Sequence, residues 1–446
     1  MLVPHVSLVY SLTLLSYCHS FTVDPTSQAS LKSGATTNAA GLRVFYHGDE
    51  PGQIPGNFPY PTYWWQAGAA MNAWIDYRNY TGDSTYDAIV TQAMLFQVGP
   101  NNDYLPPNQT LAEGNDDQGF WGLAAMSAAE RNFPNPPSTG VQWLALAQAV
   151  FNGQATRWDD ANCGGGLRWQ IFAFNNGYGY KNSISNGIFF QLGARLAQYT
   201  GNDTYAQWAE KAYNWTTSVK FLTSTYIIYD GADVPDCITG FDRIQWTYNT
   251  GMYLGGAAFM YTYQNQSSIW LSRVEALLDS SISLFFSSGT IVYEPACEPE
   301  QTCNDDQTSF KGYLARNMGY TAQLIPSLAD KIFNVLGSSA VAVGKCCNGG
   351  TGTVCGNDYT KGTFDGHTGV GEAIAALEVI QAPLAKYASS PSSARTGGTS
   401  TGDVNAGTTS SSGHTLTEPP PTTAGKFSAV FVTILVSLST FGTYLA

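Results

Sequence analysis

The 446-residue chain is poor in charge and rich in aromatic side chains, which excludes several classes of protein. Lysine and arginine number 20 against 33 aspartates and glutamates. The net charge of −13 therefore argues against a nucleic-acid binder, which needs a basic surface. Charged residues are 12% and aromatic residues 13% of the chain, whereas disordered chains are rich in charge and poor in aromatics. We expect a large folded body that binds something neutral and polar, such as a sugar.

The first 20 residues have the features of a secretory signal peptide. Residues 2–17 are apolar and contain no acid, and small side chains at Cys18 and Ser20 precede Phe21. This stretch is too short for a stable membrane span. The alternative is a buried N-terminal helix.

The C-terminus predicts a lipid anchor. Serine, threonine, glycine and proline dominate residues 388–425, which predicts a disordered stalk. Residues 426–446 form an apolar tail with no basic flank after it, which favours a glycosylphosphatidylinositol (GPI) anchor over a retained tail helix. The attachment residue is Ser411 or, with a longer spacer, Asn405. We therefore expect a secreted protein held at the cell surface, plasma membrane or cell wall by lipid alone.

Cysteine usage agrees with secretion. Without Cys18, seven cysteines remain, so one thiol should be free or paired between chains. Local disulfides are expected for Cys297–Cys303 and within the group of Cys346, Cys347 and Cys355, whose connectivity the sequence leaves open. A zinc site is a poor alternative because no histidine cluster lies nearby. Five sequons are candidate N-glycosylation sites: Asn79, Asn108, Asn202, Asn214 and Asn265.

Between about residues 30 and 387 the apolar residues repeat mainly with a helical period. The expected helices are 64–80, 84–97, 117–132, 140–153, 183–200, 204–217, 249–264, 267–286, 320–337 and 370–385. The best strand patterns are 226–230 and 290–293. So many helices without an intervening linker predict an all-α fold, an (α/α) barrel that forms one catalytic domain over residues 21–387.

One helix junction occurs twice. Tyr-Thr-Gly-Asp at 80–83, followed by Tyr86, resembles Tyr-Thr-Gly-Asn at 199–202, followed by Tyr205. We expect both glycines to end a helix in the left-handed conformation, and the polar residues after them to cap the next helix. The separation of the two copies suggests two turns of one helical toroid.

The chemistry is expected to come from carboxylates. Beyond the signal peptide only His47, His367 and His414 remain, which leaves too few parts for a Ser–His–Asp site or a multi-histidine metal site. A carboxylate pair is the remaining hydrolytic apparatus for a neutral substrate, and it requires no metal or cofactor.

Three pairs of adjacent aspartates exist, at 116–117, 159–160 and 305–306. Asp116 and Asp117 open an apolar helix, where the helix dipole stabilises one ionised carboxylate while the proximity of the two raises one pKa. That division suits an anionic nucleophile beside a protonated acid. The pair at 305–306 is typical of a rim or calcium-type turn, and the pair at 159–160 of a loop cap.

The order of motifs along the body resembles glycoside hydrolase family 76, the endo-α-1,6-mannanase family, in its fungal cell-wall branch with a GPI anchor. The motifs are YWWQAG at 63–68, GNDDQGFW at 114–121, RWD at 157–159, CGGGLRW at 163–169, YKNSISNG at 180–187, YDG at 229–231, QWTYN at 245–249 and FKG at 310–312. The resemblance covers about residues 40–385.

The resemblance implies an (α/α)6 barrel and a retaining double displacement. By position, Asp116 would be the nucleophile and Asp117 the general acid/base. The spacing of the two residues alone does not separate retention from inversion, because adjacent residues can reach either carboxyl separation. Candidate substrate-binding residues with polar groups are Asn115, Lys181, Asn182, Asp230 and Lys311, and candidate aromatic platforms are Trp65, Trp121, Trp169, Trp246 and Tyr248.

The resemblance implies an enzyme of fungal cell-wall biogenesis that acts on α-1,6-linked mannose, in mannan or in the core glycan of GPI anchors. With an anchor, a transglycosylase that transfers mannosyl groups to a wall glucan acceptor is also expected. We expect a monomer. The alternative is a non-catalytic glycan-binding wall protein on the same barrel.

Overall fold

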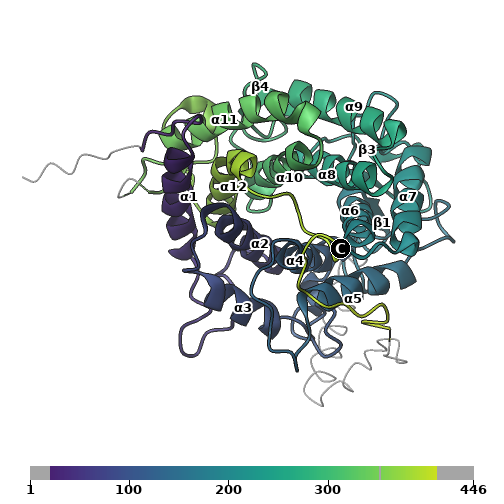
Figure 1. The fold of residues 1–446 in the computed structure, drawn as a ribbon. Helices are drawn as coiled ribbons and strands as arrows, with labels where there is room; N and C mark the ends of the chain where they lie inside the picture. The colour runs from purple at the N-terminus through teal and green to yellow at the C-terminus, as the bar shows by residue number, and fades with distance from the viewer. Residues whose placement is uncertain (1–20, 351–352, 409–446) are drawn as a thin grey trace, which may run out of the picture. The chain divides into compact units, whose positions relative to one another are not determined.

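The structure is a computed structural model that describes residues 21–350 and 353–408; the predicted signal peptide and hydrophobic tail lie outside them. Within this part the chain forms twelve α-helices (Figure 1). They are α1 (Gln28–Arg43), α2 (Trp64–Thr81), α3 (Asp87–Phe96), α4 (Asn115–Glu130), α5 (Trp143–Thr156), α6 (Ser183–Thr200), α7 (Asp203–Ser218), α8 (Thr247–Tyr263), α9 (Ser268–Phe285), α10 (Phe310–Leu324), α11 (Ala329–Cys346) and α12 (Val370–Gln381). None of the helices described is long and apolar enough to cross a membrane.

The even-numbered helices form a closed inner ring. Each of α2, α4, α6, α8, α10 and α12 packs against the next, and α12 returns to α2. The odd-numbered helices lie outside this ring, so the chain alternates between an outer and an inner helix (Figure 1). The predicted (α/α)6 barrel is confirmed.

Burial explains which helices form the inner ring. Every residue of α12 is buried, as is every residue of α4 except Asp117, because these helices have neighbours on all sides. Glycine allows the close approach, since a Cβ on Gly251 of α8 would lie 2.9 Å from the Cα of Leu314 in α10. The outer helices are amphipathic, and α7 buries one face that includes Tyr205, Ala209 and Tyr213.

Both glycines of the repeated junction have the predicted conformation, but only the second copy forms the predicted cap. Gly82 and Gly201 end α2 and α6 with φ of 80° and 73°, a conformation that glycine adopts without strain. The Asn202 side chain caps α7 by accepting a hydrogen bond from the Thr204 amide at 3.0 Å. Helix α3 begins after Tyr86, which makes no side-chain cap, and Asp83 accepts instead from the Thr85 amide.

Three sequence expectations for secondary structure were wrong. The apolar pattern at 320–337 spans the end of α10 and the start of α11, which are separated at Pro326 because proline cannot donate the helical hydrogen bond. Helix α1 and most of α10 were missed, since alanine, glycine and polar residues blur their period. The segment 226–230 forms only an isolated bridge between Leu222 and Ile228.

The strands are short and lie in loops. Strands β1 (Tyr180–Asn182), β2 (Gly231–Asp233) and β3 (Phe241–Asp242) form an antiparallel sheet in that order, with Lys181 opposite Ala232. Strands β4 (Phe286–Ser287) and β5 (Ile291–Val292) form a hairpin after α9, where the pattern at 290–293 predicted a strand.

Three disulfides bind the loops of the described chain. They join Cys163 to Cys237, Cys297 to Cys303 and Cys347 to Cys355, and Cys346 is left as a buried free thiol. The expected odd cysteine is therefore Cys346.

The first part of the predicted stalk packs on the barrel. Residues 388–408, which we name the C-terminal strap, lie on the barrel in an extended path rather than apart from it. The amide of Ser392 donates to the Glu130 carbonyl at 2.9 Å, and the Ser400 hydroxyl accepts from the amide of Leu144. Further along, the Asn152 side chain donates to the carbonyls of Val404 and Ala406. Amino-acid composition did not predict these contacts, because backbone groups and the Ser400 hydroxyl make them rather than apolar side chains.

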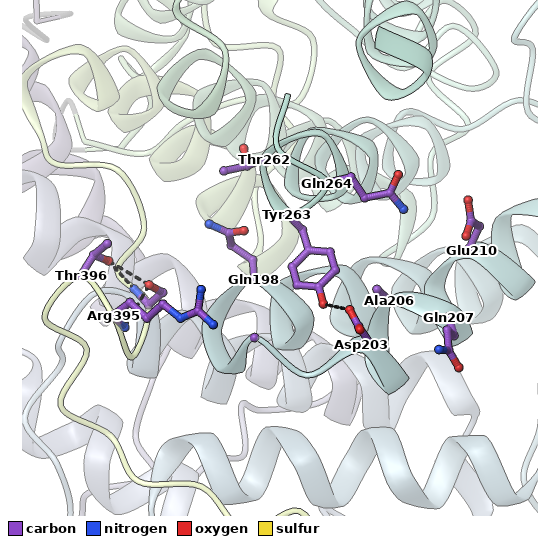
Figure 2. A pocket seen from close by; sticks show the side chains of 12 residues that line it. Gln198, Asp203, Ala206, Gln207, Glu210, Thr262, Tyr263, Gln264, Arg395 and Thr396 are labelled. Carbon is purple, nitrogen blue, oxygen red and sulfur yellow. Dashed lines mark hydrogen bonds between the residues drawn. The ribbon is translucent and has the colours of Figure 1, made fainter. Parts of the chain in front are cut away.

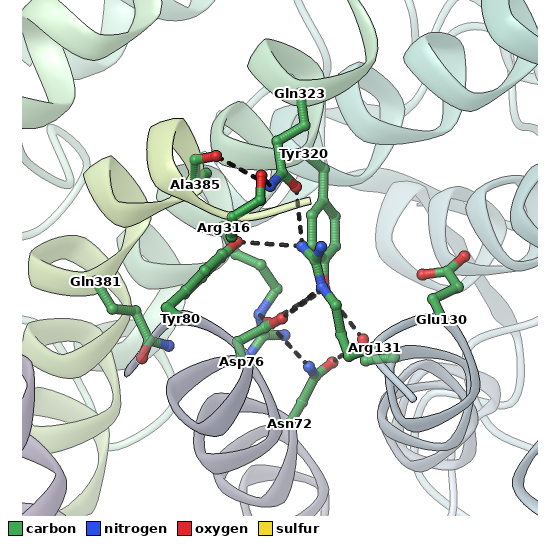
Figure 3. A network of polar contacts seen from close by, with 12 residues as sticks. Asn72, Asp76, Tyr80, Glu130, Arg131, Arg316, Tyr320, Gln323, Gln381 and Ala385 are labelled. Atoms are coloured by element: carbon green, nitrogen blue, oxygen red, sulfur yellow. Dashed lines mark hydrogen bonds and ion pairs between the residues drawn. The ribbon is translucent and has the colours of Figure 1, made fainter. Parts of the chain in front are cut away.

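A cluster of buried charges lies near the C-terminal ends of the inner helices, and Figure 3 shows part of it from close by. Asp76 of α2 pairs with Arg131 and Arg316, each at 3.4 Å. Arg316 also pairs with Glu378 at 2.5 Å, and Arg195 pairs with Glu130 at 2.6 Å. These six residues are three arginines and three carboxylates, so the cluster is formally neutral; we call it the central charge cluster.

Candidate active site

The two candidate catalytic aspartates lie in the first turn of α4. Gly114 is the N-cap of this helix, and its amide donates to Asp117 Oδ2 at 2.6 Å. The amide of Asp117 donates to Asp116 Oδ1 at 3.1 Å. Backbone amides at a helix N-terminus thus hold one oxygen of each carboxylate, an arrangement that favours negative charge there.

Glycine at position 114 is required by the approach of both carboxylates. A Cβ there would lie 2.3 Å from Asp116 Oδ1 and 2.5 Å from Asp117 Oδ2. The neighbouring loop fixes this start of the helix, because the amide of Asn115 donates to the Trp169 carbonyl at 2.7 Å.

Both carboxylates face a cleft of about 420 Å³ at the N-terminal ends of five inner helices. It is lined by Tyr63, Trp65, Leu111, Ala112, Asp116, Asp117, Phe120, Trp169, Gln170, Tyr180, Asn182, Asp230, Trp246, Tyr248, Asn304, Asp306, Gln307 and Phe310. Helices α2, α4, α6, α8 and α10 each contribute from their first turn or the residues before it. The barrel therefore brings together segments far apart in the sequence.

Aromatic rings form the walls of the cleft. Trp65 packs on Phe120 with ring centroids 4.5 Å apart, and Tyr248 stacks on Phe310 at 3.8 Å. Trp169 is 37% exposed at the rim, so its ring is available to a ligand. Such rings offer apolar faces on which a sugar can stack.

Burial raises the pKa of both aspartates. For Asp117 the negative charge of Asp116 adds to burial and holds the pKa well above its ordinary range. For Asp116 burial also raises the pKa, but hydrogen bonds from the backbone and from the Asn182 side chain oppose the rise. Asp117 therefore retains its proton to higher pH than Asp116 does.

Two further carboxylates face the same cleft. Asp230 accepts a hydrogen bond from the Tyr180 hydroxyl at 2.8 Å, and burial raises its pKa to about 6. Asp306 accepts from Trp65 Nε1 at 2.8 Å, and burial raises its pKa to about 6 as well. Sequence reasoning placed Asp306 in a rim turn, whereas the structure places its side chain in the lining of the cleft.

The two candidate lysines lie outside the cleft. The Lys181 ammonium is fully buried and donates to the carbonyls of Asp159, Asn162 and Gly165 at 2.6–3.0 Å. Lys311 is also buried and forms an ion pair with Glu298. Both ammonium groups hold loops together, so the structure gives them architectural contacts in place of the expected sugar contacts.

Asn115 and Trp121 also lie behind the cleft wall. Asn115 is buried, donates to the Arg168 carbonyl and accepts from Arg157 Nε at 2.8 Å. Trp121 is fully buried and stacks between Trp64 and Tyr104. Both side chains are buried among interior residues, and neither lines the cleft.

The sequons differ in exposure. Asn108, Asn214 and Asn265 are exposed, whereas Asn79 and Asn202 are partly buried. Over residues 21–350 and 353–408, no group of three or more histidine, cysteine, aspartate or glutamate side chains is arranged to hold a metal ion.

Comparison with known proteins places this geometry in a family. The family model of glycosyl hydrolase family 76 matches residues 30–395. The chain belongs to this family. Mannan endo-1,6-alpha-mannosidase DCW1 of Saccharomyces cerevisiae is 47% identical over 395 residues, which cover 88% of this chain and 87% of that protein. Mannan endo-1,6-alpha-mannosidase DFG5 of the same yeast is 43% identical and covers 91% and 89%.

Solved structures give the same family 76 fold. Dfg5 from Chaetomium thermophilum, crystallised in complex with glucosamine, is 44% identical with a TM-score of 0.83 and covers 86% of this chain and 97% of that chain. An inactive double-aspartate variant of an alpha-1,6-mannanase from Salegentibacter, in complex with alpha-1,6-mannotriose, has a TM-score of 0.64 and covers 79% and 99%. At 17% identity, the second likeness concerns the fold alone.

Proposed function

We propose that this family 76 protein cleaves α-1,6-linked mannose chains by a retaining double displacement, with Asp116 as nucleophile and Asp117 as general acid/base. The observation that carries the proposal is the pair itself. Both carboxylates face one aromatic cleft, and their environments separate their proton affinities in the order that these roles need. Two relatives that match most of the chain are named mannan endo-1,6-alpha-mannosidase.

In each of the two displacements, one bond to the anomeric carbon forms while another breaks. The Asp116 carboxylate attacks that carbon while Asp117 gives its proton to the departing glycosidic oxygen, which leaves a mannosyl ester on Asp116. Asp117, now ionised, takes a proton from the incoming hydroxyl, and the new oxygen bond displaces Asp116. With water the product is a reducing sugar; with a sugar hydroxyl it is a new glycoside.

The remaining lining suits sugar binding. We infer that Trp65, Trp169, Trp246 and Tyr248 offer stacking faces and that Asn182 and Asp230 bond mannose hydroxyls. Among the described residues lining the cleft there is no lysine or arginine, while four aspartates lie there. The negative charge of these carboxylates disfavours phosphorylated sugars and is compatible with neutral or amine-bearing ones. This supports mannan, or the mannose–glucosamine core of a GPI glycan, as substrate.

The predicted ends of the chain suggest where this chemistry occurs. A signal peptide and a GPI anchor would place a monomeric enzyme at the fungal plasma membrane or cell wall, attached by lipid alone. There, transfer of a mannosyl group to wall glucan would join polymers, whereas hydrolysis would only shorten them.

The test uses the full secreted chain with an α-1,6-mannan oligosaccharide, alone and with a β-glucan oligosaccharide as acceptor. Asp116→Asn should lose nearly all turnover, by about 10³-fold or more. Asp117→Asn should lose as much on the oligosaccharide but less on a substrate with a good leaving group, which needs no protonation. Asp160→Asn, a matched change in an aspartate pair outside the cleft, should leave turnover unchanged.

The products separate the possibilities. Joined mannosyl-glucan supports transfer, and free reducing ends alone support hydrolysis. Undiminished turnover in Asp116→Asn would refute the assigned nucleophile. A wild-type protein that binds the oligosaccharide without turning it over would favour the glycan-binding alternative.

A further inference from the structure

A second cavity, larger than the catalytic cleft, lies at the other end of the barrel. Figure 2 shows this cavity from close by. Its volume is about 650 Å³. Its walls come from the C-terminal ends of α6 and α8, from one face of α7 and from the C-terminal strap. The lining residues are Gln198, Gly201, Asp203, Ala206, Gln207, Glu210, Thr262, Tyr263, Gln264, Ser393, Arg395 and Thr396. We name this cavity the strap groove.

The lining of the strap groove is polar and nearly balanced in charge. Three glutamines line it; the amides of Gln198 and Gln207 offer both donors and acceptors, whereas Gln264 Oε1 already accepts from Trp270 Nε1 at 3.1 Å. Tyr263 presents an aromatic ring whose hydroxyl donates to Asp203 (Figure 2). Two acids, Asp203 and Glu210, oppose one base, Arg395. The groove thus offers amides, hydroxyls and one aromatic ring, and its small net charge creates no strong electrostatic field. Such a lining suits a neutral polyhydroxy ligand and selects against a nucleic acid or an apolar peptide.

A sequon adjoins the groove on each of two sides. Asn202 lies between Gly201 and Asp203, which both line the groove, and Asn265 directly follows Gln264. The Asn202 cap of α7 uses Oδ1, whereas an N-linked glycan is attached through Nδ2, so capping and glycosylation are compatible. Asn265 is exposed immediately after α8.

Covalent attachment decides which sugar occupies the groove. A glycan tethered at the rim is present at an effective concentration in the millimolar range or above, so weak contacts suffice to seat it. A free oligosaccharide would have to compete with that tethered chain for the same amides.

We propose that the strap groove seats the inner N-acetylglucosamine residues of the protein's own N-linked glycan, carried by Asn202 or Asn265. Ser393, Arg395 and Thr396 belong to the C-terminal strap, so the seated glycan contacts strap and barrel together. This proposal stands independently of the catalytic one, because the groove and the cleft lie at opposite ends of the inner helices.

The experiment follows the release of each glycan by peptide N-glycosidase from the native full chain secreted by a fungal host, with site-resolved mass spectrometry. A seated glycan should be released about tenfold more slowly, or slower still, than the glycan on Asn108, which is exposed in a loop near the catalytic end. The difference should vanish once the protein is denatured.

Two variants distinguish the sources while preserving the fold. Thr204→Ala removes the sequon of Asn202 but keeps its capping side chain, and Ser267→Ala removes that of Asn265 at a position whose side chain makes no cap. The protected signal should disappear in one of them. The double variant Gln198→Ala with Gln207→Ala should raise the native release rate toward that of Asn108 without changing mannoside turnover.

Three outcomes would overturn the proposal. They are bare asparagine at both positions, native release as fast as at Asn108, and slow release that survives the double glutamine variant.

Discussion

Neutralising Asp76 should destabilise the barrel without affecting catalysis. Asp76 is the one carboxylate of the central charge cluster that pairs with two arginines, Arg131 and Arg316, and all three side chains are almost fully buried. Asp76→Asn keeps the shape of the side chain and removes only its charge. The cluster then carries a net positive charge among buried side chains, where a charge is poorly solvated, so the folded state loses free energy.

The expected size follows from burial and chain length. Breaking a buried ion pair costs about 3–5 kcal/mol. Unfolding entropy is about 2.1 cal/mol/K per residue, which gives about 0.8 kcal/mol/K for a body of roughly 390 residues. Asp76→Asn should therefore lower the melting temperature by about 4–6 °C.

The measurement is a thermal scan by calorimetry or circular dichroism, with mannoside turnover measured at 25 °C. Asp279→Asn is the matched control, because Asp279 pairs with Lys331 where their side chains are 64% and 48% exposed, and such pairs contribute about 1 kcal/mol at most. Equal shifts in the two variants, or lost turnover in Asp76→Asn at full stability, would refute the reasoning.

Three further predictions concern the catalytic end. Gly114→Ala should reduce turnover by about 100-fold or more, since its Cβ would displace Asp116 and Asp117, whereas Gly140→Ala, whose Cβ meets nothing closer than 3.4 Å, should change little in the same reducing-sugar assay. Because burial raises the pKa of both aspartates, the pH–rate profile should lose activity on the acid side well above pH of about 4, as Asp116 gains its proton, and on the alkaline side as Asp117 loses its own. Burial raises the pKa of the Glu113 carboxyl in the folded protein to about 8. The wild-type protein should therefore lose stability as the pH rises from the ordinary carboxyl pKa of the unfolded chain to about 8, and the melting temperature of Glu113→Gln should rise relative to that of the wild type across this range.

Each of these three has a clear contrary result. Full activity in Gly114→Ala would mean that the first turn of α4 tolerates displacement. A pH–rate profile that loses activity on the acid side only near the ordinary carboxyl pKa would contradict a nucleophile whose pKa is raised by burial. A constant difference in melting temperature between Glu113→Gln and wild type would show that this carboxyl titrates alike in both states.

Helices and their ends could be predicted from the sequence where a helical period of apolar residues is followed by a glycine that ends the helix. The junctions at Gly82 and Gly201 are local, and the structure reproduces them because the left-handed turn depends on a few neighbouring residues. Ring closure, in contrast, depends on contacts between helices far apart in the sequence. The number of helices and the repeated junction predicted a barrel, and its six-fold form followed from the family resemblance.

The candidate catalytic pair could be predicted where charge and helix position coincide, and the motifs shared with the family also pointed to six residues that line the cleft: Trp65, Trp169, Asn182, Asp230, Trp246 and Tyr248. Asp116 and Asp117 were identifiable because they start an apolar helix. Asp306 was missed because its approach to Trp65 joins segments more than 200 positions apart. Lys181 and Lys311 were predicted to line the cleft because charged residues are rare in this chain. Nothing in the sequence indicated that their ammonium groups would be buried among carbonyls and a carboxylate.

The C-terminal strap has a practical consequence for anyone producing the protein. A shortened form that stops at residue 387, where composition suggests the folded part ends, would remove the partners of Leu144, Asn152 and the Glu130 carbonyl, and one wall of the strap groove. A form that runs to residue 408 keeps all of them. Expression trials should therefore compare these two end points first.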